Sequence, residues 1–222
     1  MIIAEQKPFP ILEEFLKPYK KVLLVGCKGC VTVCSAGGKK EVGLLSAALR
    51  LARQSNGEPL EITEMTVERQ CDPEYLAPLK GPASEHDVVL SMGCGAGVQF
   101  LAEHLPKTLV LPALNTVMIG VTERSGTWTE RCQACGDCKL HLTGGICPVS
   151  RCSKSIMNGP CGGSIDGHCE IDKSVPCGWQ LIIDRMAELG TLDAYYERII
   201  PASDWRTSRD GGPRIRERED LK

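Results

Sequence analysis

Short apolar runs alternate with longer amphipathic stretches between residues 21 and 112. Uninterrupted aliphatic runs are typical of strands buried on both faces of a parallel sheet, and apolar positions three and four residues apart predict helices. The expected strands are residues 21–26, 61–67, 88–92 and 109–111, and the expected helices are residues 41–54, 73–79 and 98–104. Strands alternating with helices predict a small, Rossmann-like parallel α/β sheet with right-handed crossovers.

The segments on either side of this region have weaker patterns. Residues 10–19 have a helical pattern, residues 113–131 resemble a connection, and residues 178–190 and 192–200 are expected to be helices. The polar tail, residues 201–222, is expected to be either a mobile terminus or an arm that orders on a partner. The expected organisation is a helical lead-in over 1–20, an α/β domain over 21–125, an irregular cysteine-rich module over 126–178, and C-terminal helices with an extended tail over 179–222.

Composition and charge exclude several classes of protein. A formal net charge of −2 over 222 residues provides no concentrated basic surface, so nucleic acid is not expected as a partner. The start of the chain lacks a basic segment followed by a long apolar run, and the most apolar run, residues 109–121, is broken by Pro112. Neither export nor membrane insertion is therefore expected. Thirteen cysteines in such a chain are more often metal ligands than disulfides, which predicts a cytoplasmic metalloprotein.

Five cysteines belong to the expected α/β domain. Cys27 ends its first strand, Cys30 and Cys34 follow closely, Cys71 follows the second strand, and Cys94 follows the third. Carboxyl ends of parallel strands lie at one edge of the sheet, so we expect these thiols to form a site there. Four thiolates complete one [4Fe–4S] cluster, and a helical start would place Cys30 and Cys34 on one face. We therefore favour Cys30, Cys34, Cys71 and Cys94 as ligands, with Cys27 as the spare; a structural zinc site or buried thiols are the alternatives.

The other eight cysteines lie between residues 132 and 177. The first three form C-x2-C-x2-C, a spacing typical of ferredoxin-type cluster binding, and a Cys-Pro pair follows after a gap too long for a ferredoxin domain. Eight thiolates match two four-thiolate clusters by number. One cluster with one zinc ion, or one cluster with spare thiols, fits equally well. The eight are Cys132, Cys135, Cys138, Cys147, Cys152, Cys161, Cys169 and Cys177.

Other candidate sites are less well supported by the sequence. Residues 93–97 read G-x-G-x-G, which lacks the G-x-G-x-x-G spacing and the downstream acidic residue of a dinucleotide-binding loop. His141 and His168 lie among the cysteines and are further candidate metal ligands. No arrangement of nucleophile and base, and no pair of catalytic carboxylates, is evident in the sequence. We therefore expect electron transfer by the chain and no substrate chemistry of its own.

Three segments resemble a known family, and together they extend over nearly the whole chain. They are CKGCVTVCSAGG at 27–38, SMGCGAGVQ at 91–99, and the cysteine-rich stretch CQACGDCKLHLTGGICPVSRCSKSIMNGPCGGSIDGHCEID at 132–172, with the tail WRTSRDGGPR at 205–214. These residues resemble the MetV-type small subunit of methylenetetrahydrofolate reductase. The segment GGICP…NGPCGG is the most specific part of the resemblance.

The resemblance implies a function that the residue pattern alone does not specify. A MetV-type subunit binds two or three [4Fe–4S] clusters, with zinc as a further occupant of one cysteine set. It pairs with a MetF-type TIM-barrel subunit, which holds FMN and reduces methylenetetrahydrofolate in the Wood–Ljungdahl pathway of anaerobes. The subunit would then conduct electrons between that flavin and an external donor protein. The alternatives are a zinc-stabilised structural adaptor and a cluster subunit of another redox complex, such as a hydrogenase or heterodisulfide reductase.

Overall fold

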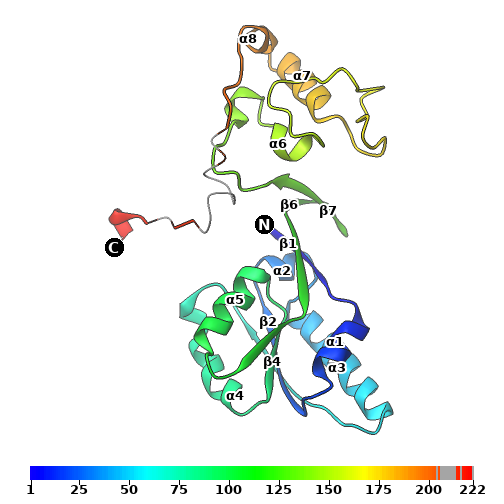
Figure 1. Ribbon diagram of the computed structural model, residues 1–222, viewed down its shortest axis with the longest axis vertical. Coiled ribbons are helices and arrows are strands. Elements are labelled where there is room, and N and C mark those ends of the chain that lie inside the picture. Colours follow the sequence, from blue (N-terminus) through cyan, green and yellow to red (C-terminus); the bar gives the residue numbers. More distant parts are fainter. Residues whose placement is uncertain (204, 206–213, 216, 222) are drawn as a thin grey trace. The chain divides into compact units, whose positions relative to one another are not determined.

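The computed structural model describes residues 1–203, 205, 214–215 and 217–221. The chain divides into two compact units, Met1–Trp128 and Thr129–Lys222, which we call unit 1 and unit 2 (Figure 1). The tail expected at 201–222 falls partly on residues 204, 206–213, 216 and 222, which lie outside the described residues. Within the described part of the chain, no helix combines the length and the apolar character needed to cross a membrane.

A four-stranded parallel sheet forms the centre of unit 1 (Figure 1). Its strands are β2 (Lys21–Cys27), β3 (Glu61–Val67), β4 (Val88–Ser91) and β5 (Leu109–Pro112), in the order β3-β2-β4-β5. Every neighbouring pair is parallel, as the alternation of strands and helices predicts. The chain leaves β2 towards β3 and leaves β4 towards β5, so the direction of winding reverses between two adjacent strands. In open α/β sheets, ligands bind at the carboxyl ends of the strands beside such a reversal.

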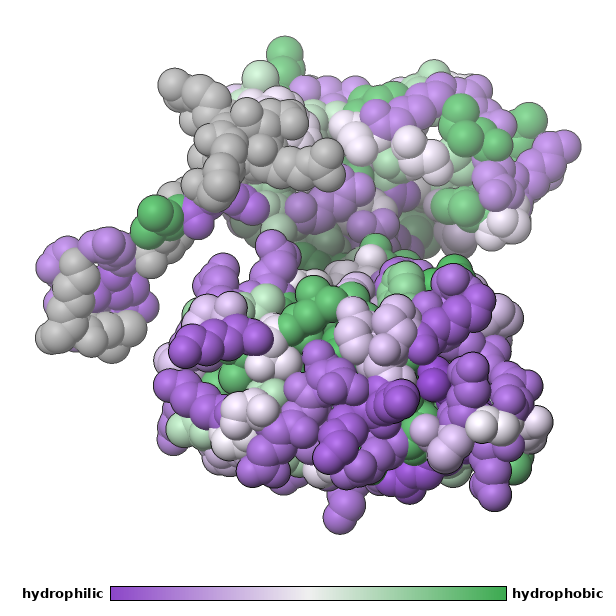
Figure 2. Space-filling model, turned by 60° about the horizontal axis from the view of Figure 1, so that its bottom comes forward, coloured by the Kyte–Doolittle hydropathy of each residue, from purple (hydrophilic) through white to green (hydrophobic). Residues whose placement is uncertain are grey.

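Helices cover both faces of this sheet because alternate strand residues point to opposite sides. Val22 and Leu24 of β2 belong to the hydrophobic cluster that includes helices α1 (Phe9–Leu16) and α3 (Lys39–Ser55). Leu23 and Val25 belong to a second cluster with α4 (Lys80–Ser84) and α5 (Gly95–His104), on the other face. The surface of unit 1 seen in Figure 2 is correspondingly largely hydrophilic. The remaining helical elements of unit 1 are α2 (Cys30–Val33), the 3₁₀ turns Pro73–Tyr75 and Ala77–Leu79, α4 (Lys80–Ser84) and α5 (Gly95–His104).

A second sheet corrects two predictions made from the sequence. Strands β1 (Ile2–Gln6), β6 (Leu114–Arg124) and β7 (Thr127–Cys132) form a three-stranded sheet in the order β1-β6-β7. The pattern predicts a helical lead-in over 1–20, which contains the expected helix as α1 but begins with strand β1. It also predicts a connection over 113–131, which is wrong because β6 and β7 lie there. Strand β1 pairs antiparallel with β6, more than a hundred residues later in the chain. Local patterns do not reveal such a pairing, because strand formation depends on the partner strand.

Unit 2 contains few regular elements. They are the 3₁₀ turn Leu140–Leu142, α6 (Pro148–Arg151), α7 (Gly178–Glu188), α8 (Leu192–Tyr196) and the 3₁₀ turn Glu219–Leu221. Residues 152–177 form turns and bends with two isolated β-bridges. Trp179 of α7 is buried, and its Nε1 donates a hydrogen bond of 2.7 Å to Ile156 O. Asn158 exchanges two hydrogen bonds with the backbone of Ile200, so both ends of α7–α8 are fastened to the irregular loop.

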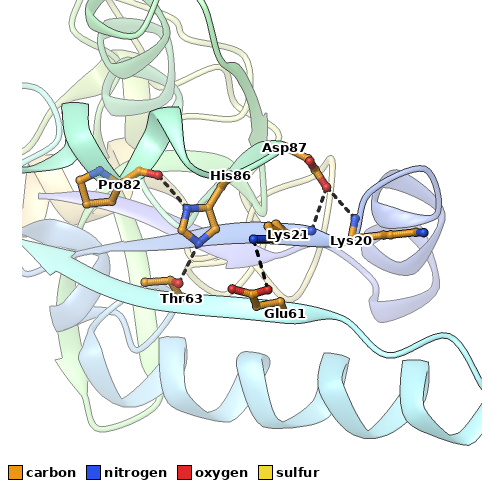
Figure 3. A network of polar contacts seen from close by, with 7 residues as sticks. All are labelled: Lys20, Lys21, Glu61, Thr63, Pro82, His86 and Asp87. Atoms are coloured by element: carbon orange, nitrogen blue, oxygen red, sulfur yellow. Dashed lines mark hydrogen bonds and ion pairs between the residues drawn. The ribbon is translucent and has the colours of Figure 1, made fainter.

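A network of polar contacts crosses from strand to strand in unit 1 (Figure 3). His86 links the Pro82 carbonyl to the Thr63 hydroxyl, with 2.7 Å at each ring nitrogen. Asp87 Oδ2 accepts hydrogen bonds of 2.8 Å from the backbone amides of Lys20 and Lys21. These two amide bonds lower the pKa of the Asp87 carboxyl below its ordinary value of 3.8. The carboxylate therefore fixes the start of β2 beside the start of β4.

We expect Asp87→Ala to lower the unfolding temperature of unit 1 more than Asp87→Asn does, because asparagine keeps an oxygen that can accept from the two amides. Since folding lowers the pKa of Asp87, its contribution is complete above the ordinary value of 3.8 and is lost as the pH falls through the folded-state value. Thermal unfolding at pH 7, followed by circular dichroism, measures the difference. Equal unfolding temperatures for the wild type and Asp87→Ala would contradict it.

Candidate metal centres

Four cysteines of unit 1 gather at the carboxyl edge of the parallel sheet. Cys27 is the last residue of β2, Cys30 is the first of α2, and Cys94 is the N-cap of α5. Cys71 follows β3 and is exposed. Partial desolvation, and then the neighbouring thiols of Cys94, Cys27 and Cys30, raise the pKa of the Cys71 thiol. The thiols of Cys27, Cys30 and Cys94 therefore lie within electrostatic reach of Cys71, and we call these four cysteines the first group.

Cys34 is not among the thiols that act on Cys71. Its Sγ is 3.6 Å from Ala4 O and 3.7 Å from Val31 O, and the residue is buried in the core beneath β1. The spacing of the cysteines favours Cys34 as a ligand and Cys27 as the spare, and that choice stays a prediction. Both residues belong to the same hydrophobic cluster, and Cys27 is among the thiols that act on Cys71. Helix α2 is a single turn that ends at Val33, with Cys34 as its C-cap. Cys34 N still donates to Cys30 O at 3.2 Å, so one helical turn joins the two cysteines.

A second group lines a cavity of about 270 Å³ in unit 2. Its cysteines are Cys132, Cys135, Cys138 and Cys147. The loop turns sharply because Ala134 and Gly136 adopt positive φ angles of 51° and 87°. This turn directs the Ala134 N–H towards Cys132 Sγ, at 3.3 Å. The C-x2-C-x2-C loop and the Cys-Pro pair therefore contribute to one site, although the gap between them is longer than in a ferredoxin.

A third group lines a much smaller cavity of about 20 Å³. Its cysteines are Cys152, Cys161, Cys169 and Cys177. The hydrogen bond between Cys169 Sγ and Ser153 Oγ (3.4 Å), followed by bonds from the Ile171 and Asp172 amides, lowers the pKa of the Cys169 thiol. A lowered pKa favours the thiolate, which is the form that binds metal. The eight cysteines of unit 2 thus separate into the first four and the last four along the chain.

One cysteine in each group caps the N-terminus of a helix. Cys94 precedes α5, Cys147 precedes α6 and Cys177 precedes α7. The free amides at a helix N-terminus carry partial positive charge, which stabilises a thiolate or an anionic metal centre. The effect is largest for the longer helices α5 and α7, because α6 is a single turn. The grouping of the thiols and the charge at the helix N-termini therefore both favour Cys94, Cys147 and Cys177 as metal ligands.

The three groups are spread more widely than a single ion requires. Among the residues that the structure describes, no three His, Cys, Asp or Glu side chains are close enough together to hold one metal ion. A zinc–sulfur bond is about 2.3 Å long, so four zinc ligands have to converge closely. A four-iron cluster is larger than one ion and accepts thiolates from farther apart. Neither His141 nor His168 lines the second or third cavity; His168 lines a neighbouring hollow together with Cys169.

Comparison with known protein families identifies the C-terminal part of the chain. Residues 111–206 match the family described as methylene-tetrahydrofolate reductase C terminal. The match covers 96 of the 222 residues. The match confirms the resemblance to methylenetetrahydrofolate reductase proposed from the sequence. No curated protein and no solved structure matches the chain.

The methylene-tetrahydrofolate reductase C-terminal segment contains the whole of the second and third groups. The first group lies outside it, on the parallel sheet. Sequence reasoning identified all the cysteines but missed the polar residues around them, such as Ser153 beside Cys169 and Gln70 beside Cys71. Gln70 is 1% exposed, and a glutamine directly before a loop cysteine carries no sequence signal of burial.

Proposed function

We propose that this chain is the iron–sulfur electron-transfer subunit of a methylenetetrahydrofolate reductase complex. In that complex it passes electrons between an external donor protein and the flavin of a MetF-type catalytic subunit. The observation that carries the proposal is the division of twelve of the thirteen cysteines into three groups of four. Four thiolates are the usual ligand set of a [4Fe–4S] cluster.

The second group fits such a cluster best, and we propose a further cluster at the four thiols of the first group. The cavity of about 270 Å³ in the second group has room for a body larger than one ion. A cluster bound at these thiols supplies reversible one-electron transfer. The protein's own contribution is to hold the sulfurs, to offset negative charge through helix N-termini, and to donate the Ala134 amide to Cys132 Sγ. Hydrogen bonds to ligand sulfurs of this kind tune the reduction potential of a cluster.

For the third group we propose a single zinc ion with a structural role, around which the four thiols would have to close from their wider positions in this structure. Its cavity of about 20 Å³ is more than ten times smaller than that of the second group. A space of this size is close to that of one water molecule, for which about 10–15 Å³ is needed. Four thiolates are a common structural zinc set, and closing them onto the ion couples metal binding to folding. The zinc would then fasten the irregular loop to α7.

The catalytic partner follows from the family of the C-terminal segment. A methylenetetrahydrofolate reductase reaction needs a folate site and a flavin, and we assign both to a MetF-type TIM-barrel subunit. The similarity of residues 111–206 to the methylene-tetrahydrofolate reductase C-terminal family supports this assignment. The exposed Cys71 supports electron entry or exit at the edge of the sheet, because a centre close to solvent is accessible to a redox partner.

Anaerobic co-expression with the flavin-containing partner tests the proposal. We expect a brown protein with about eight iron and eight sulfide per chain, from two four-iron clusters, and about one zinc. After chemical reduction of the clusters, mixing with the oxidised partner should bleach the flavin absorbance in a stopped-flow experiment. The change is expected only with the metal-loaded chain.

The two alternatives give different results in the same experiment. A colourless chain with zinc, no iron and full support of partner activity would identify a zinc-stabilised adaptor. A brown chain that binds no flavin-containing partner and leaves the flavin oxidised would indicate a cluster subunit of another redox complex.

A further inference from the structure

A buried glutamine lies at the carboxyl edge of the parallel sheet, directly before Cys71. Gln70 is 1% exposed, although its side chain is polar and it follows the end of β3 by only a few residues. Its Nε2 donates to Val25 O at 2.9 Å and to Gly26 O at 3.2 Å. Its Oε1 accepts from the Ser91 hydroxyl at 2.5 Å. A buried amide with all of these bonds made is fixed in one orientation.

The series of hydrogen bonds continues from Gln70 to the loop that carries Cys94. Ser91 Oγ, which is fully buried, accepts from the backbone N–H of Gly93 at 3.1 Å. Because Ser91 accepts from Gly93, its own proton is directed to Gln70 Oε1. The polarity of every bond in the chain is therefore determined: Gly93 donates to Ser91, Ser91 to Gln70, and Gln70 to the end of β2.

This series of hydrogen bonds reaches every loop that carries a thiol of the first group. Gln70 is bonded to Cys71 through the peptide chain, Gly26 precedes Cys27, and Gly93 precedes Cys94. One side chain thus links three segments that are separated by more than twenty residues each. Backbone hydrogen bonds from Lys28 N to Val67 O (2.9 Å) and from Met92 N to Val25 O (2.8 Å) also join these segments, and Gln70 adds the side-chain link between them.

Two of the glycines in residues 93–97 leave space for the side chain of Gln70. A Cβ at Gly93 would lie 2.5 Å from Gln70 Oε1, and a Cβ at Gly97 would lie 3.0 Å from Gln70 Cβ. A Cβ at Gly95, between them, would meet only Thr116 Oγ1, at 3.5 Å. Two of the three glycines therefore admit the Gln70 side chain, which accounts for a G-x-G-x-G loop that lacks dinucleotide-binding features.

We propose that Gln70, through Ser91 and the glycine loop, is the positioning residue of the first cysteine group and sets the geometry of the metal centre held there. This inference rests on the proposed iron–sulfur function of that group. The glutamine touches no sulfur; it acts by holding the backbones from which Cys27, Cys71 and Cys94 extend. Loss of its hydrogen bonds should therefore change the occupancy and the electronic properties of this centre and leave the second group unaffected.

The test compares Gln70→Met, which keeps the length of the side chain and removes its hydrogen bonds, with Ser91→Ala, which breaks only the link to the Cys94 loop. The signal of the first group is defined as the electron paramagnetic resonance signal that disappears in Cys71→Ser. In Gln70→Met we expect iron to fall from about eight towards about four per chain, and any remaining signal to change in shape and midpoint potential. Ser91→Ala should change the same signal less.

Matched controls separate positioning from general destabilisation. Ser46 is fully buried in the same unit, and its hydroxyl has no hydrogen-bond partner among the described residues, so Ser46→Ala should leave the signal unchanged. Gly95→Ala should also leave it unchanged, whereas Gly97→Ala should alter it.

Three outcomes are decisive. If Cys71→Ser removes no signal and no iron, the iron–sulfur function of this group fails, and the inference fails with it. If Cys71→Ser removes a signal that keeps its shape, potential and intensity in Gln70→Met, the function stands and the positioning role is refuted. If Gln70→Met does not fold, Ser91→Ala decides by the same criterion.

Discussion

The Cys27→Ala chain should contain about four fewer iron atoms than the wild type, whereas the Cys34→Ala chain should contain the same number. Both cysteines are buried, at 9% and 5% exposure, and they lie seven residues apart. Cys27 is among the thiols that act on Cys71, while Cys34 is enclosed by the core near Ala4. The iron content should therefore differ because Cys27→Ala removes a cluster ligand, whereas Cys34→Ala removes only one small buried side chain.

Iron and sulfide analysis after anaerobic purification measures this difference. The two variants control for each other, because each removes one buried sulfur from the same segment of unit 1. Thermal unfolding of the metal-free proteins should show similar, small losses of stability for both. Loss of iron in Cys34→Ala with full retention in Cys27→Ala would restore the ligand set that the spacing alone favours and would reject the first group as described.

Gly178→Ala should disrupt the third group and destabilise unit 2. An alanine Cβ there would lie 2.4 Å from Arg151 O, 2.6 Å from Arg151 C and 2.9 Å from Cys152 N. All three are backbone atoms, so relief requires movement of α7 away from the end of α6. Overpacking of this kind costs about 1–3 kcal/mol. The movement also separates Cys177, which precedes the glycine, from Cys152, so we expect loss of the bound zinc.

Gly81→Ala in α4 provides the control, because a Cβ at Gly81 meets no atom within 4 Å. We expect this variant to be neutral or slightly stabilising, as alanine is a better helix former. Zinc analysis and thermal unfolding are measured on both proteins. A Gly178→Ala chain with normal zinc content and an unchanged unfolding temperature would show that the close approach of α7 to α6 is not needed.

The sequence predicts the parallel sheet well, because burial on both faces leaves a clear pattern. Strands such as β2 read as continuous aliphatic runs, and the helix α3 has an apolar stripe over Val42, Leu45 and Leu49. The second sheet is a different case. Strand β6 is exposed along much of its length, so its residues have no strong alternation, and its pairing with β1 depends on residues far away in the chain.

The cysteine sites are likewise predictable where they depend on neighbouring residues in the sequence and not where they depend on contacts between distant segments. The edge of the sheet is predictable from Cys27, Cys71 and Cys94, since each follows a strand. Whether Cys27 or Cys34 completes the first group is not predictable from the spacing, because it depends on how the single-turn helix α2 places Cys34. The burial of Gln70 cannot be predicted for a related reason. It depends on the space that Gly93 and Gly97 leave for the side chain, and the glycine spacing does not indicate which residue occupies that space.

The short helix α6 has a consequence for how the metal centres are assembled. Cys147 lies at its start and Cys152 at its end, so one turn of helix, about 5.4 Å long, joins a cysteine of the second group to a cysteine of the third. Filling either centre orders this turn and removes conformational freedom that the other centre would otherwise have to remove. We therefore expect cooperative loading, in which chains carrying both metal centres or neither outnumber chains that carry one.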